Sequence, residues 1–137
     1  MPSVAVDSNI LYALFDAGDR AHSLAKAFIA APGGPIVSNV PVITEVAYML
    51  EHSKRSQLRF LQFAYRALAI DAETPGDLPR IIEIMDKYAD LPADFADAAL
   101  LAQCERTGID QIATLDRDFD VYRLANGRPL VNVIVRT

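Results

Sequence analysis

The chain has 137 residues, of which 52% are hydrophobic and 23% charged, a balance typical of one globular domain and not of a disordered chain. Its formal net charge of −5 by itself disfavours nucleic-acid binding, because phosphate repels carboxylate. If bound metal neutralised four of the 18 acids, however, the 13 basic residues would nearly balance the rest, so acidity does not exclude a nuclease.

In chain order, short apolar runs alternate with stretches of helical periodicity. The predicted strands cover residues 4–6, 36–38, 67–71, 111–115 and 130–135. The predicted helices cover about 10–15, capped by Ser8 or Asn9, and about 22–31, 41–50, 56–66, 78–88 and 94–107, with a turn at 74–77. This alternation predicts a single α/β domain over residues 1–137, with a mostly parallel sheet covered on both faces.

The ends of the sequence and its single cysteine bear on location. No apolar run is long enough to span a bilayer, so no membrane association is expected. Residues 1–7 lack a basic segment followed by a long apolar one, which predicts no signal peptide. With Cys104 as the only cysteine, no intrachain disulfide can form, and the cytoplasm is the expected compartment.

Two aspartates stand where predicted strands end. Asp7 closes the run 4–6, and Asp116 closes the run that begins near Gln111. In open α/β sheets, ligand sites gather beyond the carboxyl ends of the strands, so these two acids are candidates for one site.

Two further acids lie in apolar helical stretches. Asp97 is the only polar residue in the window 95–102, which predicts a buried helix carrying one carboxylate. Such a carboxylate costs free energy unless a cation, a hydrogen-bond donor or a proton offsets its desolvation. Glu45 is similar, because Val42 and Met49 share its helix face.

Each acid also has a structural explanation. Asp7 and Asp94 can cap the helices that follow them, and Asp97 can favour the dipole of its helix from the first turn. Asp116 begins a charged run of the kind found in solvated loops, and Glu45 can be a surface acid on a helix flank. Taken separately these roles are ordinary, but they do not explain four acids converging at one end of a sheet.

A metal site explains the convergence. Mg²⁺ and Mn²⁺ are hard cations that prefer oxygen ligands, and in such sites they promote in-line hydrolysis of phosphodiesters. The chain has no His–Cys cluster, glycine-rich phosphate loop or Gly-x-Ser-x-Gly motif, which excludes zinc hydrolases, nucleotide kinases and serine esterases. For RNA contact, the densest basic patch is Lys54, Arg55 and Arg59, with Arg117 as a further candidate.

Four short motifs resemble those of PIN-domain ribonucleases and occur in the same order along the chain. The form of these motifs and the length of the chain are most similar to those of the VapC toxins of bacterial and archaeal toxin–antitoxin pairs. The motifs are Val6-Asp7-Ser8-Asn9-Ile10-Leu11, Thr44-Glu45-Val46, Asp94-Phe95-Ala96-Asp97-Ala98 and Thr114-Leu115-Asp116-Arg117-Asp118-Phe119.

The resemblance implies a PIN-like three-layer α/β/α sandwich with a central sheet of about five parallel strands. It implies a Mg²⁺- or Mn²⁺-dependent endoribonuclease that is usually a homodimer, silenced by a VapB-like antitoxin whose peptide lies near the acids. The expected catalytic and metal-binding residues are Asp7, Glu45, Asp97 and Asp116, with Ser8, Asn9, Asp94, Thr114 and Asp118 as supporting polar residues. The fourth acid is Asp116 or Asp118, of which Asp116 better fits the end of the strand.

Other functions fit part of the pattern. A PIN nuclease of RNA maturation would share the site without an antitoxin, and a PIN-like interaction protein would share only the fold. A receiver-like Mg²⁺-binding regulatory module also places an acidic site at strand ends, but this chain shows no acidic pair after the first strand and no lysine in the last.

Overall fold

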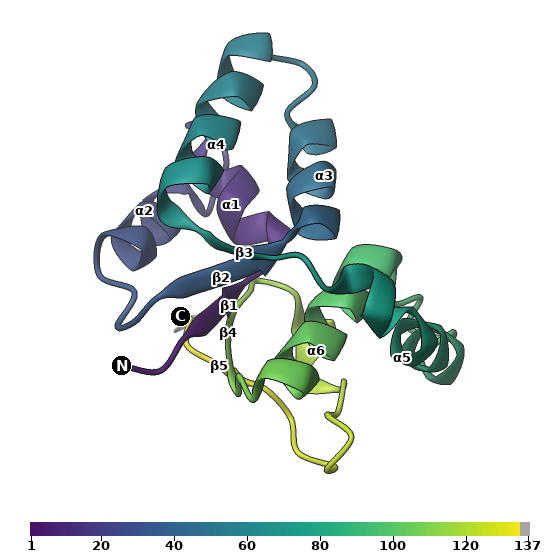
Figure 1. Ribbon diagram of the computed structural model, residues 1–137. Helices are drawn as coiled ribbons and strands as arrows, with labels where there is room; N and C mark the ends of the chain where they lie inside the picture. Colours follow the sequence, from purple (N-terminus) through teal and green to yellow (C-terminus); the bar gives the residue numbers. More distant parts are fainter. Residues whose placement is uncertain (135–137) are drawn as a thin grey trace.

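The computed structural model describes residues 1–134 (Figure 1). Its elements, in order, are β1 (Val4–Val6), α1 (Ser8–Leu14), α2 (His22–Ala30), β2 (Ile36–Asn39), α3 (Val40–Met49), α4 (Lys54–Ala67), β3 (Ala69–Asp71), α5 (Thr74–Lys87), α6 (Phe95–Thr107), β4 (Gln111–Ala113), the 3₁₀ helix η1 (Arg117–Asp120) and β5 (Val131–Asn132). Val135, the end of the last predicted strand, lies outside the described residues.

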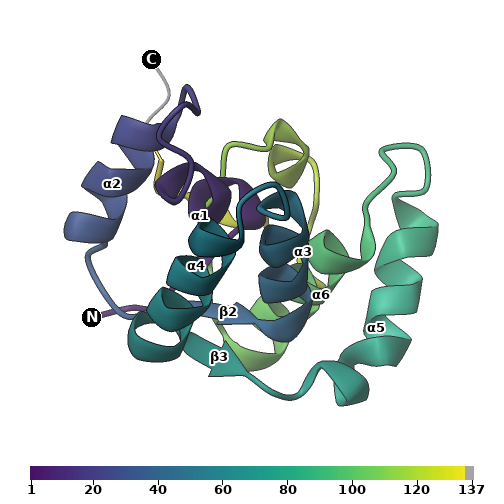
Figure 2. The same cartoon turned by 90° about the horizontal axis from the view of Figure 1, so that it is seen from above.

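The five strands form one parallel sheet in the order β3-β2-β1-β4-β5. The apolar β1 is buried along its whole length and lies at the centre, where Val4 pairs with Ile36 of β2 and with Gln111 of β4. Helices α1–α4 cover one face, and α6 with α5 against it covers the other (Figures 1 and 2). The predicted three-layer α/β/α sandwich with a five-stranded sheet is confirmed.

The predicted buried helix is also confirmed. From Ala96 to Cys104, every residue of α6 except Asp97 is buried. The helix ends at Gly108, whose positive φ of 73° forms a left-handed C-cap. A buried amide pair fixes α6 beside the end of β2, because Asn39 Nδ2 donates to Gln103 Oε1 at 2.9 Å.

Some predicted boundaries are wrong. The stretch 74–77, predicted as a turn, is the first turn of α5, where Pro75 costs no hydrogen bond and Asp77 favours the helix dipole. Helix α4 begins two residues earlier than predicted because the Ser53 hydroxyl accepts from Ser56 N at 3.2 Å. Strand β4 is shorter than predicted because Leu115 N donates to Asn9 Oδ1 at 3.0 Å instead of continuing the ladder.

Among the described residues, no helix is both long enough and apolar enough to cross a bilayer.

Candidate metal centre

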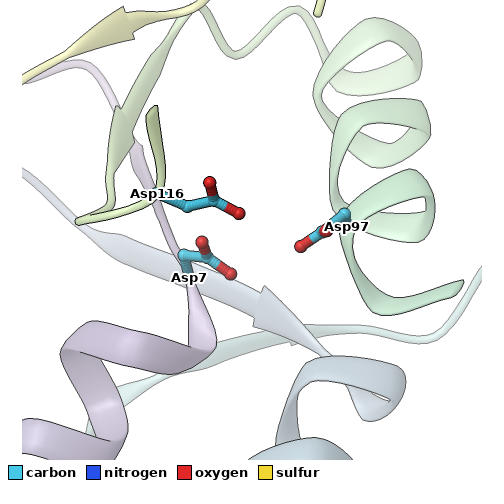
Figure 3. A group of neighbouring side chains, drawn as sticks. All are labelled: Asp7, Asp97 and Asp116. Carbon is cyan, nitrogen blue, oxygen red and sulfur yellow. The ribbon is translucent and has the colours of Figure 1, made fainter. Parts of the chain in front are cut away.

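Three of the four predicted acids come together in one cluster. Asp7 follows β1, Asp116 follows the neighbouring β4, and Asp97 lies in the first turn of α6. One carboxylate oxygen from each lies within 4.8 Å of the others. Figure 3 shows Asp7 and Asp116 facing Asp97 across the space between the strand ends and α6. We call these three residues the acid cluster.

The Asp7 carboxylate is the best-supported member of the acid cluster. Its side chain is only 2% exposed and accepts hydrogen bonds from Thr114 Oγ1 at 2.6 Å, Asn9 Nδ2 at 3.2 Å and Ser8 N at 2.7 Å. The bond from Ser8 N makes Asp7 the N-cap of α1, so the structural role considered from the sequence is real. The same carboxylate therefore begins a helix and faces the other acids.

Thr114, which supports Asp7, also holds Asp116. Thr114 Oγ1 accepts from Asp116 N at 2.9 Å, and Asp118 N donates to Asp116 Oδ1 at 2.9 Å. Asp118 thus lies in η1 and supports Asp116 through its backbone, and its carboxylate is not a member of the acid cluster. Between the two residues left open by the sequence, the geometry brings Asp116 to the other acids.

Glu45 stands beside the acid cluster and is linked to it by Ser8. The Ser8 hydroxyl donates to Glu45 Oε1 from α3 and lies 3.5 Å from Asp7 Oδ1. Glu45 is outside the group of three whose oxygens lie within 4.8 Å. Burial is the largest factor raising its pKa; the bond from Ser8 lowers that pKa, and the charge of Asp94 raises it.

Asp94 has the capping role that the sequence offered for it. It is the exposed N-cap of α6, and its Oδ1 accepts from Asp97 N at 2.8 Å. This bond fixes the first turn of α6, from which Asp97 faces Asp7 and Asp116.

The acid cluster concentrates negative charge without a protein cation. Burial raises the pKa of Asp97 to about 8, with Asp7 as the next cause, and burial raises the pKa of Asp7 to about 6 despite the bond from Thr114. Within residues 1–134, no lysine, arginine or histidine forms an ion pair with these carboxylates or with Glu45. An all-carboxylate donor set flanked by hydroxyl and amide groups fits a hard divalent cation such as Mg²⁺ or Mn²⁺.

The predicted basic patch lies elsewhere. Lys54, Arg55 and Arg59 are exposed on α4, and in the described part of the chain none of them bonds to the four acids. Arg59 lines a separate cavity of about 540 Å³ between α1, α2 and α4. Of the four basic candidates, only Arg117 adjoins the acid cluster, as the residue after Asp116.

Two polar side chains near the site were missed from the sequence. The Asn132 side chain donates to Thr114 O at 3.0 Å and accepts from Thr114 N at 3.3 Å, which clamps the residue that supports Asp7. In the sequence, the only indication of a role for Asn132 was its amide side chain within an apolar run. Tyr122 lies buried after η1, and the charge of Asp97 is among the factors that raise its pKa. Nothing in its local sequence distinguished it from a core aromatic residue.

A largely apolar cavity of about 590 Å³ lies at the starts of α3 and α6, and none of the four predicted acids lines it. Thr44, which precedes Glu45, and Phe95, two residues before Asp97, both line it. Its remaining lining is mostly apolar and comes from the start of α3 and from the segment between β3 and α5, including Val40 and Leu78.

Comparisons with known proteins agree with this architecture. The family model described as "PIN domain" matches residues 4–124. The structure of Mycobacterium tuberculosis VapC20, described as a sarcin-ricin loop cleaving toxin, superposes with a TM-score of 0.80 at 23% identity, covering 92% of this chain and 99% of that one. No curated protein matches the sequence.

Two further solved structures match at lower sequence identity. VapBC2 from Rickettsia felis, bound to a DNA fragment from its promoter, has a TM-score of 0.61 at 14% identity, with 87% and 92% of the two chains covered. FitAcB from Neisseria gonorrhoeae has a TM-score of 0.53 at 9% identity, with 83% and 88% covered. At these identities the three structures support a common fold.

Proposed function

Because this chain belongs to the PIN-domain family, we propose that it is a metal-dependent endoribonuclease and the toxin of a VapBC-type toxin–antitoxin pair. The observation that carries the proposal is the convergence of Asp7, Asp97 and Asp116 within 4.8 Å without a neutralising side chain among the described residues. A receiver-like module, the alternative considered from the sequence, is not supported by the family match.

In this proposal the acid cluster holds Mg²⁺ or Mn²⁺. A bound divalent ion supplies a polarised phosphoryl oxygen and a water of lowered pKa, so no histidine or lysine base is required. Asp7, Asp97 and Asp116 bind the ion, and Glu45, held by Ser8, orients the attacking water. Thr114 and Asn9 keep the buried Asp7 carboxylate directed at the site through their hydrogen bonds.

The similarity to VapC20, described as a sarcin-ricin loop cleaving toxin, supports an RNA substrate. The similarity to VapBC2 and FitAcB supports a VapB-like antitoxin as partner. The apolar cavity lined by Thr44 and Phe95 fits apolar side chains of an antitoxin peptide. The uncompensated acids fit a basic side chain of the same peptide. Exposed apolar residues on α5, Ile82 at 66% and Met85 at 36%, suit the face of a homodimer. A PIN nuclease of RNA maturation would lack the antitoxin, so a small antitoxin-like reading frame beside the gene would favour the toxin.

Incubation of the purified protein with total RNA tests the activity. We expect cleavage with Mg²⁺ or Mn²⁺ and none with EDTA or in the Asp97→Asn variant. Asp86→Asn, which removes an exposed acid from α5, is the matched control and should cleave like the wild type. Cleavage that persists in EDTA or in Asp97→Asn, or its absence from the folded wild type with both ions, would contradict the proposal.

A further inference from the structure

The cavity of about 540 Å³ between α1, α2 and α4 is lined by two cations and, among residues 1–134, by no aspartate or glutamate. The cations are Lys26 of α2 and Arg59 of α4, and we call this space the basic cavity. Asp16, at the end of α1, instead accepts from the Tyr12 hydroxyl at 2.6 Å. In a chain with a net charge of −5, a cavity lined by positive charge alone favours an anionic ligand.

The helical spacing of the lining residues brings both cations to one place. In α2, Lys26 and Ile29 are three residues apart and share a face that lines the basic cavity. In α4, Arg59 and Phe63 are four residues apart and line it in the same way. Both helices lie on the same face of the sheet as α1 (Figures 1 and 2). Each helix therefore presents one cation and one apolar side chain to the same space.

Neither cation serves the fold through an ion pair. Lys26 and Arg59 are exposed, and within the described part of the chain neither pairs with a carboxylate. Arg80 and Arg106, by contrast, each pair with two carboxylates. The charges at the basic cavity are therefore free for a ligand from outside the chain.

Two aromatic rings form another wall of the basic cavity. Phe15 and Phe63 both line it, with ring centroids 5.5 Å apart. Phe15 also packs edge-on against the fully buried Phe60 at 5.7 Å, which anchors this wall to the core. Rings beside cations are the combination that binds single-stranded RNA, because the bases pack on the rings and the phosphates contact lysine and arginine. The volume also lies within the range of about 300–1,000 Å³ that is usual for small-ligand sites.

Helix α1 connects the basic cavity with the acid cluster. Asp7 is the N-cap of this helix and Phe15 is its C-cap. At about 1.5 Å per residue, the two caps lie about 12 Å apart along the helix axis. A stacked strand advances about 3.4 Å per nucleotide, so this distance corresponds to about three or four nucleotides.

We propose that the basic cavity binds a nucleotide of the RNA substrate a few positions away from the cleaved bond, with Lys26 and Arg59 on phosphates and Phe63 against the base. The inference rests on the proposed function, because it assigns a second place on the protein to the RNA that is cut at the acid cluster. Of the basic patch predicted from the sequence, Arg59 lines this cavity and Lys54 and Arg55 do not.

A double variant, Lys26→Gln with Arg59→Gln, tests the inference. The probe is a fluorescein-labelled pool of random 12-nucleotide single-stranded RNA, and its binding is followed by fluorescence anisotropy in EDTA. We expect the Kd at low salt to rise at least about tenfold, and the salt dependence of log Kd to fall by about 1.4, since each phosphate contact contributes about 0.7. An unchanged Kd and an unchanged salt dependence would overturn the inference.

The matched control is Arg66→Gln with Lys87→Gln. It removes the same charge from exposed positions of α4 and α5 that do not line the basic cavity. Its Kd should stay close to that of the wild type, and an equal loss would show that affinity follows net charge alone, which would overturn the inference. All four substituted residues are exposed, so urea unfolding should give similar stability for both double variants.

A measurement on the wild type locates the RNA directly. In an NMR titration with the same RNA pool, the backbone amide signals of Lys26, Ser56 and Arg59 should shift, because all three residues line the basic cavity. A glutamate-rich peptide is titrated in parallel. Shifts at these residues from the peptide and none from RNA would show that the cavity binds acidic protein segments, and would overturn the inference.

Cleavage of total RNA with Mn²⁺ separates this inference from the proposed function. The variant with Lys26→Gln and Arg59→Gln should cleave more slowly than the wild type at half-saturating RNA and should approach it as RNA saturates. If the wild type cleaves no RNA, the proposed function fails and this inference fails with it. If the wild type cleaves RNA and the variant matches it at both concentrations, only the role of the basic cavity fails.

Discussion

The two ends of α6 lie beside acids in opposite electrostatic situations. Near the C-terminal part, Arg106 bonds to Asp77 at 2.8 Å and also to Asp71, so arginine neutralises both carboxylates. At the N-terminal end, Asp97 faces Asp7 and no protein cation pairs with either in the described residues. The same fold therefore supplies arginines where acids serve structure. In the described residues no arginine pairs with the acid cluster, as expected under the proposed function, in which a divalent cation from solution neutralises it.

The largest expected effect comes from Asp97→Asn. Loss of this ligand should lower the rate of metal-dependent RNA cleavage at least about 100-fold, because ligands to a catalytic ion contribute several kcal/mol to the barrier. The same change should raise the free energy of unfolding in EDTA at pH 8, since it removes a poorly compensated charge. Gel-based cleavage assays and urea unfolding measure the two effects, and a variant that loses both activity and stability would contradict the account.

The second-largest expected effect is a pH dependence of metal-free stability that originates in the acid cluster. The pKa of Asp7 is raised from 3.8 to about 6 and that of Asp97 to about 8, so the folded protein binds more protons than the unfolded chain between about pH 4 and 8. Metal-free stability should therefore fall as pH rises through this window and level off above it. Asp7 alone accounts for about 3 kcal/mol.

Urea unfolding in EDTA at several pH values measures this slope. We expect this slope to be smaller in saturating Mn²⁺ than in EDTA. We also expect it to be smaller in Asp97→Asn than in the wild type. A metal-free stability that rises steadily from pH 4 to pH 8 would show that the acid cluster is not strained by its own charge.

A smaller effect is expected from breaking the paired region. Arg106→Gln leaves Asp77, whose side chain is 9% exposed, without its cation. Because the arginine is itself partly exposed, the free energy of unfolding should fall by about 2 kcal/mol, less than for a fully buried pair. Arg66→Gln, on the exposed end of α4, is the matched control and should change little. Mn²⁺ affinity should be retained in both, and its loss in Arg106→Gln would mean that the two regions are coupled.

The smallest effect concerns the support of Asp7. Thr114→Val keeps the shape of a fully buried side chain but removes the hydroxyl that donates to Asp7 Oδ2 at 2.6 Å. We expect a loss of about 1 kcal/mol in unfolding free energy and a further rise in the pKa of Asp7. NMR titration of the carboxyl carbon follows that pKa. Thr114→Ser, which keeps the hydroxyl, should behave like the wild type, and equal behaviour of the valine and serine variants would exclude the role of this bond.

The acid cluster was largely predictable because its signals are local. A lone acid in the apolar window 95–102 predicted Asp97, and strand ends predicted Asp7 and Asp116, since neighbouring parallel strands end at the same edge. Glu45 was also found, but the sequence could not show that Ser8 links it to Asp7, because that bond joins residues 37 positions apart.

What could not be predicted depends on irregular segments. The start of α5 at Thr74 was missed because proline and glycine in that stretch are typical of turns, and only the tertiary context selects a helix. Asn132 and Tyr122 were missed for a related reason. The hydrogen bonds of Asn132 to Thr114 and the packing of Tyr122 depend on how the segments after β4 fold against the sheet. This packing leaves no periodic pattern in the sequence.

The most direct test of the metal site is a crystal structure of the protein soaked in Mn²⁺, with anomalous data collected at the manganese edge. The account predicts an anomalous peak coordinated by oxygens of Asp7, Asp97 and Asp116, directly or through water. A folded protein with no peak there, or with a peak only elsewhere, at Mn²⁺ concentrations that support RNA cleavage would contradict it.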